Sequence, residues 1–180
     1  MGSPRVFLTY IRERVLGPDN PYTAASLNSL ALLYSNHGRL KEAEPLYQRA
    51  LEIRERVSGP DHPDTALSLN NSAFFYEKQG RPKEAEPLYR RSLEIRESVL
   101  GPDHPDTIIG LNSLGVFFFE RGRTLEAEGL LRKALGIAER VFGIGHPRTN
   151  QIAQTYLQVL QKMGWGHKAS KVRNRFKIKP

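Results

Sequence analysis

The sequence contains no cysteine among its 180 residues. This absence excludes a disulfide framework, a thiolate zinc or iron–sulfur site, and a cysteine nucleophile. Long apolar runs are also missing, since no stretch approaches the roughly 18 residues that a membrane span needs. The first residues, MGSPRVFLTY, have neither the apolar core nor the cleavage site of a secretory signal. We therefore expect a cytoplasmic protein with no membrane span.

Fingerprints of catalysis are equally scarce. The chain has no P-loop, no dinucleotide-binding glycine pattern and no nucleophile elbow. His62, His104 and His146 recur at intervals of 42 residues, each before a proline. Stacked helices separate equivalent atoms by about 10 Å, whereas zinc ligands lie about 2 Å from the metal, so these histidines are predicted to be loop residues at helix starts. We predict no catalytic residue, no metal, no cofactor and no enzymatic activity.

A period of 42 residues organises the sequence. The string Gly-Pro-Asp-(Asn/His)-Pro starts at Gly17, Gly59 and Gly101, and a decayed version starts at Gly143. Periods of this length indicate stacked helical repeats. We divide the single array into repeats over residues 17–58, 59–100, 101–142 and 143–180, preceded by residues 5–16, which match the end of a repeat.

Each repeat carries two helical patterns. In the second repeat, a helix is predicted from about Pro63 to Gln79, with Asp61 or Asp64 capping or favouring its positive end and Gly80 ending it. A further helix is predicted from about Pro82 to Leu100, and no strand pattern is present. This gives nine helices: an orphan over 5–16, three antiparallel pairs, and a last pair with a short second helix and a basic tail.

The repeats resemble a known family. The pattern of large, small and aromatic positions in tetratricopeptide repeats is matched at Leu27, Leu30, Ala31, Tyr34, Ala43, Tyr47 and Ala50, and it recurs in the next two repeats. The 42-residue length, with LNSLALLY and EAEPLYQRALEIRERV, is similar to the kinesin-light-chain and nephrocystin type. The resemblance implies an all-α tetratricopeptide-repeat solenoid, a right-handed superhelix of antiparallel helix pairs, that serves as a protein–protein interaction scaffold or adaptor. The motor-binding coiled coil of kinesin light chains is absent, so a motor subunit is not inferred.

Polar positions that persist between repeats are candidates for binding. An amide side chain recurs at Asn28, Asn70, Asn112 and Gln154. The resemblance implies that the first helix of each pair lines a concave groove, where side-chain amides could hold the backbone of an extended peptide. The alternative is that each asparagine bonds a neighbouring helix and fixes the repeat geometry, and both roles can hold.

Positions that vary along the same face are predicted to set specificity. They comprise the polar residues Asn71 and Lys78 and the apolar residues Leu67, Phe74, Ile109, Val116 and Phe119. These side chains predict an extended or helical peptide ligand with apolar anchors and modest charge. Within the phenylalanine runs, Phe75, Phe117 and Phe118 are expected to fill the core.

The net charge of +8 is concentrated at one end. From Lys162 onward the chain has seven basic residues and no acidic one, and the tail itself comprises Lys168, Lys171, Arg173, Arg175, Lys177 and Lys179. One interpretation is a charge-driven binder of acidic protein, anionic lipid or nucleic acid. The other is a solvated cap on the array. Nucleic acid is disfavoured because no folded reader motif is present.

The orphan helix predicted over residues 5–16 would leave an apolar face uncovered. That face indicates a fragment of a longer array, a tolerated exposure, or self-association through this helix.

Overall fold

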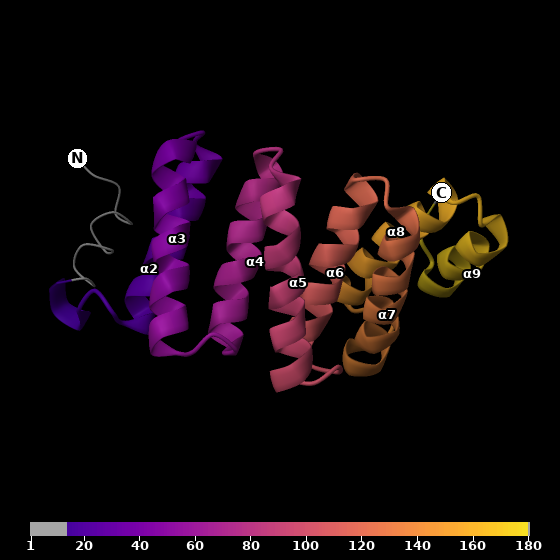
Figure 1. Cartoon of the computed structure of the whole chain (residues 1–180). Helices are drawn as coiled ribbons and strands as arrows, with labels where there is room; N and C mark the ends of the chain where they lie inside the picture. Colours follow the sequence, from indigo (N-terminus) through magenta and orange to yellow (C-terminus); the bar gives the residue numbers. More distant parts are fainter. Residues whose placement is uncertain (1–13, 180) are drawn as a thin grey trace. The chain divides into compact units, whose positions relative to one another are not determined.

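The computed structural model describes residues 14–179 (Figure 1). The orphan helix predicted over 5–16 therefore lies almost wholly outside the described residues, although residues 14–16 are helical. The chain divides into two compact units, Met1–Ile95 and Arg96–Pro180, which are described separately.

Every regular element among residues 14–179 is an α-helix, which confirms the all-α prediction. The first unit contains α2 (Pro21–Asn36), α3 (Leu40–Val57), α4 (Pro63–Lys78) and most of α5 (Pro82–Val99). The second unit contains the end of α5, then α6 (Pro105–Glu120), α7 (Thr124–Phe142), α8 (Pro147–Lys162) and α9 (Gly166–Phe176). The even-numbered helices are the first helices of the predicted pairs.

In the first unit, α2 packs on α3, α3 on α4, and α2 lies beside α4. Small residues allow the close approach, since Ala31 and Ala43 are fully buried. Phe75 of α4 packs against Tyr47 of α3 with ring centroids 5.0 Å apart. The contact joins consecutive repeats, because Tyr47 belongs to the first and Phe75 to the second.

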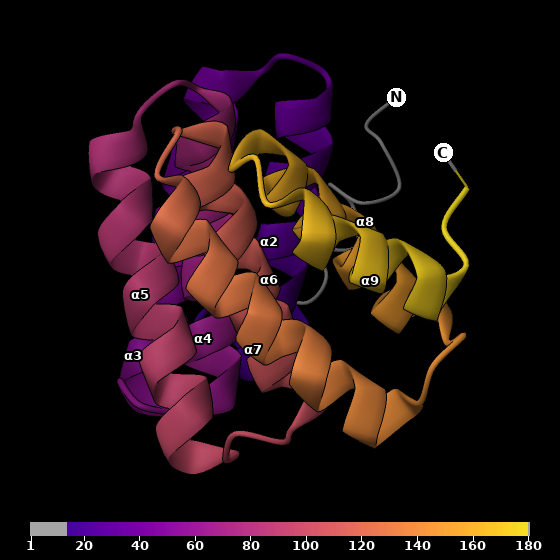
Figure 2. The same ribbon diagram turned by 90° about the vertical axis from the view of Figure 1, so that its right-hand side faces the viewer.

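The second unit has the same packing pattern: α6 on α7, α7 on α8, α8 on α9, and α6 beside α8 (Figure 2). Phe117 and Phe118 are 1% and 2% exposed, and Phe75 of the first unit is 1% exposed, so the core prediction for all three is confirmed.

Gly115 stands where the first two repeats have Ala31 and Ala73. A Cβ at this position would lie 2.8 Å from Cγ of Leu131. The glycine is explained by the residue that packs against it. Leu131 stands where the earlier repeats have Tyr47 and Tyr89, and its side chain leaves no room for a Cβ at position 115.

The helix ends use recurring residues. Gly80 follows α4 with φ of 69°, a conformation that favours glycine, as predicted. The cap at the start of α4 is His62 rather than an aspartate: its Nδ1 accepts a hydrogen bond from the Asp64 amide at 3.1 Å. Asp64 lies in the first turn, where its charge favours the helix dipole. His104 and His146 cap α6 and α8 in the same way, which confirms their predicted place at helix starts.

Replacing His104 by alanine should lower the free energy of unfolding by about 1 kcal/mol, because the Asp106 amide loses its acceptor. His104→Asn should stay near wild type, since Asn20 caps α2 with the same side-chain-to-amide bond. Urea unfolding followed by circular dichroism measures both variants. Equal stability of His104→Ala and wild type would show that the ring contributes nothing as a cap.

Candidate functional site

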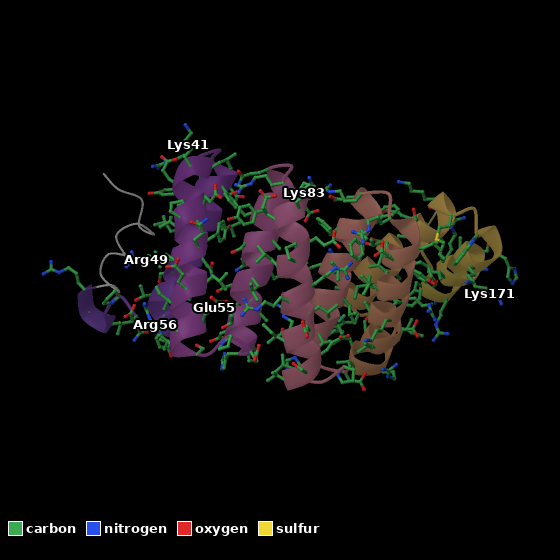
Figure 3. All side chains as sticks on the ribbon, in the orientation of Figure 1. Lys41, Arg49, Glu55, Arg56, Lys83 and Lys171 are labelled. Atoms are coloured by element: carbon green, nitrogen blue, oxygen red, sulfur yellow. The ribbon has the colours of Figure 1, made fainter. Side chains whose placement is uncertain are left out.

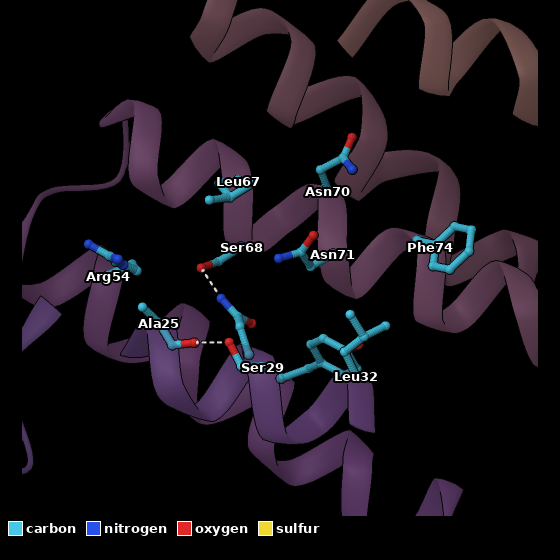
Figure 4. A pocket seen from close by; sticks show the side chains of 11 residues that line it. Ala25, Ser29, Leu32, Arg54, Leu67, Ser68, Asn70, Asn71 and Phe74 are labelled. Carbon is cyan, nitrogen blue, oxygen red and sulfur yellow. Dashed lines mark hydrogen bonds between the residues drawn. The ribbon is translucent and has the colours of Figure 1, made fainter. Parts of the chain in front are cut away.

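A pocket of about 430 Å³ lies between the first helices α2 and α4 of the first unit (Figure 4). Its apolar wall includes Leu32, Leu67 and Phe74, which are 41%, 48% and 44% exposed. The remaining lining residues are Ala25, Asn28, Ser29, Tyr47, Arg54, Ser68, Asn70 and Asn71. Five residues that the sequence assigned to the groove therefore meet here: Asn28, Leu67, Asn70, Asn71 and Phe74.

The asparagines of this pocket differ in their contacts. Asn28 donates from Nδ2 to Oγ of Ser68 at 3.0 Å and so ties α2 to α4. Asn71 extends from α4 toward Ser68 and the middle of the pocket (Figure 4). The Oδ1 atoms of Asn28 and Asn70 are buried without a hydrogen-bond partner. Asn28 thus has a geometric role, while a peptide-binding role for the asparagines stays a prediction.

Arg54 is a pocket residue that the sequence interpretation missed. It is 8% exposed, and its Nη1 donates to Asp64 at 2.5 Å, while its Nε is buried without a partner. A buried cation retained in this way needs its carboxylate partner. The repeat period could have predicted this ion pair. Both of its residues recur 42 positions later, as Arg96 and Asp106.

Arg96 belongs to the second unit and is 3% exposed. Burial lowers the pKa of its guanidinium, and the charge of Asp106 opposes this effect. The next repeat lacks this arginine–aspartate pair, since Ala138 replaces the arginine and Arg148 replaces the aspartate. The basic residue of that repeat therefore lies at the start of α8.

A second pocket of about 250 Å³ lies between α6 and α8 of the second unit. It is lined by Pro105, Ile108, Ile109, Asn112, Phe142, Arg148, Gln151 and Ile152. Two predicted groove residues, Ile109 and Asn112, meet here. In the second unit, Asn112 corresponds to Asn28 and Ile152 corresponds to Ser68. Ile152 has no side-chain acceptor, so Asn112 cannot form the bond that Asn28 donates to Ser68. Oδ1 of Asn112 is buried without a partner.

The other predicted groove residues line neither pocket. Lys78 lies over the ring of Phe74, with Nζ 5.1 Å from its centroid. Phe119 is half-buried under Lys162, whose Nζ lies 5.2 Å from the ring. Val116 is half-buried and Gln154 is exposed on α8.

Three buried tyrosines act in packing. Burial raises the pKa of Tyr47 to about 12. The hydroxyl of Tyr89 donates a hydrogen bond to Glu77 at 2.7 Å, and the hydroxyl of Tyr156 donates one to Glu128 at 2.9 Å. The pKa of Tyr156 is raised mainly by burial and, to a smaller extent, by the hydrogen bond to Glu128. Each of these bonds joins two helices of one unit, so these groups hold helices together.

Two features are absent from residues 14–179. No group of three or more His, Cys, Asp or Glu side chains there is arranged to hold a metal ion. In the same part of the chain, no helix combines the length and the apolar character needed to cross a bilayer.

One charge of the predicted basic tail has a partner. Arg175 pairs with Glu139 at 2.7 Å. The pair repeats Glu55–Arg91 and Glu97–Lys133 at intervals of 42 residues, which identifies it as the third step of a ladder along the second helices. Arg173 is half-buried, and exposed basic side chains stand at Lys168, Lys171 (Figure 3), Lys177 and Lys179.

Sequence profiles of known families agree with this arrangement of helices. Two tetratricopeptide-repeat profiles match the chain, one over residues 64–140 and the other over residues 23–64. The chain is a tetratricopeptide-repeat protein. No curated protein matches its sequence at a significant level.

Solved structures show the same fold. The tetratricopeptide-repeat chain is similar to BtubC (BKLC) from P. vanneervenii, with a TM-score of 0.79 and 23% identity over 88% of this chain and 63% of that one. It is also similar to a Podospora anserina putative kinesin light chain with nearly identical TPR-like repeats, with a TM-score of 0.80 and 22% identity over 87% of this chain and 74% of that one. The resemblance to kinesin-light-chain-type repeats is thereby confirmed at the level of the fold.

A more distant neighbour is aspartyl phosphate phosphatase F of Bacillus subtilis, with a TM-score of 0.74 and 13% identity over 87% of this chain and 39% of that one. At this identity the likeness concerns the fold alone. Membership of the tetratricopeptide-repeat family supports a general role in protein interaction.

Proposed function

We propose that this tetratricopeptide-repeat protein is a scaffold or adaptor that binds an extended or helical peptide segment of a partner along its first helices. The observation that supports this most is the recurrence of one kind of pocket in both units, between α2 and α4 and between α6 and α8. Each pocket combines an exposed apolar wall with side-chain amides and one arginine. Binding sites commonly combine apolar lining with a few polar groups that fix orientation.

The apolar side chains provide the anchoring area. Leu67 and Phe74 in the first pocket and Ile109 in the second are more than a third exposed, although most residues of their type are buried. Covering them with a partner side chain would recover part of the burial energy, about 25 cal/mol per Å². The unpaired amide oxygens of Asn70 and Asn112 supply acceptors for a peptide N–H after small rotations of the side chains.

A peptide-display selection on wild type and on a double variant, Asn70→Ala with Asn112→Ala, tests the proposal. We expect wild type to select peptides with apolar anchors and the double variant to lose them while its melting temperature stays near wild type. The matched control is Asn36→Ala with Asn174→Ala, which removes two exposed amides outside both pockets.

The control variant should select the same peptides as wild type. Recovery of an unchanged peptide set by the double variant, or loss of its fold, would assign the asparagines to repeat geometry alone.

A second candidate function is charge-driven binding of an anionic partner through the basic tail. It is favoured by the exposed cations Lys171, Lys177 and Lys179, which form no ion pair within the described residues 14–179. Such binding should weaken steeply with salt. Self-association through residues 5–16 and a cytoplasmic location stay predictions from the sequence.

A further inference from the structure

One edge of the second unit is apolar where the other repeats are polar. Leu125, at the start of α7, is 72% exposed and replaces Lys41 and Lys83 of the earlier repeats. Those two lysines lie at the starts of α3 and α5 (Figure 3). Met163, after α8, stands where the earlier repeats have His37, Gln79 and Arg121. Packing within the repeat does not explain these changes, because polar side chains serve at the same positions elsewhere.

Leu125 and Met163 line one cavity of about 430 Å³. The rest of its wall comes from Gly122, Arg123, Thr124 and Glu126. Glu126 is held by Arg123, with Arg123 Nη2 donating to it at 2.6 Å. The carboxylate is therefore neutralised by its neighbour, and the cavity offers an apolar floor to an incoming side chain.

The adjacent start of α9 carries a second replacement. In the earlier repeats an arginine lies over an aromatic ring and pairs with a glutamate three residues later, as Arg81 does with Tyr76 and Glu84. In the last repeat Trp165 replaces the arginine and Lys168 replaces the glutamate, with Nζ of Lys168 4.0 Å from the ring centroid. The last repeat therefore has an indole ring covered by a lysine where the earlier repeats have an arginine–glutamate ion pair with no net charge.

We propose that these four residues, Leu125, Met163, Trp165 and Lys168, form an edge patch that docks an acidic peptide segment carrying an apolar side chain. The apolar side chain enters the cavity between Leu125 and Met163, and the flanking carboxylates meet Lys168 and the next cation of α9, Lys171. Charge complementarity supports this occupant, because the chain has no acidic residue after Lys162. The proposal rests on the second candidate function and gives it a site.

The geometry favours a peptide over a lipid surface. Trp165 is half-buried and covered by Lys168, so its ring does not project as a membrane anchor would. The apolar part of this edge is small, because Leu125 and Met163 lie beside the charged side chains of Arg123 and Glu126, whereas membrane binding uses a broad apolar face.

Trp165 is the only tryptophan of the chain, so its fluorescence reports directly on this edge. The probe is a short synthetic peptide of glutamates with a central leucine, compared with the same peptide carrying serine in place of leucine. We expect the leucine peptide to bind with a change in tryptophan fluorescence, and the serine peptide to bind at least about tenfold more weakly because the buried leucine is lost.

The matched variant is Leu125→Lys with Met163→Gln, which restores residues that earlier repeats carry and should leave the melting temperature unchanged. It should weaken the leucine peptide about tenfold. A separate variant, Lys177→Glu with Lys179→Glu, tests the tail through two exposed lysines that the edge patch does not use.

Three results would overturn the edge patch: no binding of the leucine peptide, full binding by the Leu125→Lys variant, or binding of phosphatidylserine vesicles without binding of the peptide. If the charge variant alone weakens binding, the tail function stands and the edge patch fails. If neither variant weakens binding, both proposals fail.

Discussion

Replacing Phe75 by alanine should lower the free energy of unfolding of the first unit by about 3–5 kcal/mol, one of the largest effects expected of a single change. The side chain is 1% exposed. Its ring centroid lies 5.0 Å from that of Tyr47 and 5.5 Å from that of Tyr76. Its removal leaves a cavity between consecutive repeats, where each repeat depends on its neighbour for stability. Urea unfolding of the whole chain, with amide exchange of α3 and α4, measures the loss.

The adjacent residue supplies the control. Phe74 is 44% exposed and lines the first pocket, so Phe74→Ala should cost less than about 1 kcal/mol. Equal losses at the two positions would contradict the assignment of Phe75 to the core and Phe74 to the surface.

The second large effect concerns binding. For a peptide selected on wild type that binds the first pocket, Leu67→Ala with Phe74→Ala should lower the affinity by about tenfold to a hundredfold. The reason is that two anchoring surfaces are lost: full burial of each is worth about 1.5–3 kcal/mol, and about half of each side chain is still exposed for the partner to cover. Isothermal titration calorimetry measures the change.

The matched control for binding is Leu40→Ala with Val57→Ala, which truncates two exposed apolar residues of α3 outside the pocket. The control should bind the peptide as wild type does. If both double variants bind equally, the pocket between α2 and α4 is not the anchoring surface.

The repeat period made most of the fold predictable. Glycines at fixed intervals marked the helix ends, and Gly80 adopts the positive φ that its position predicted. The order of residues within a helix also separated Phe75 from Phe74, because adjacent side chains point about 100° apart around the helix axis. These features are local, so one sequence is sufficient to identify them.

The contacts within the pockets were harder to predict because they join residues of different repeats. Asn28 bonds Ser68, and the positions that correspond to Ser68 include Gly110 and Ile152, so nothing in the period marks the serine as a partner. The Arg54–Asp64 pair could have been found from its recurrence at Arg96 and Asp106. It was missed because arginines are frequent in the second helices and most of them are exposed.

The histidine caps show a different limit. Two aspartates flank His62, and aspartate is among the best N-cap residues. The helix begins at Pro63, so His62 takes the cap position and Asp64 falls within the first turn. A shift of one residue in the start of the helix therefore decides which side chain forms the cap.

The proposed binding face is formed by the first helices of the pairs. Amide and methyl chemical shifts of isotope-labelled protein, titrated with a display-selected peptide, locate that face directly. We expect the largest shifts at pocket residues such as Leu67, Asn71 and Phe74 of the first unit, or Ile109 and Asn112 of the second. Shifts confined to α9 or to the second helices α3, α5 and α7 would contradict the account.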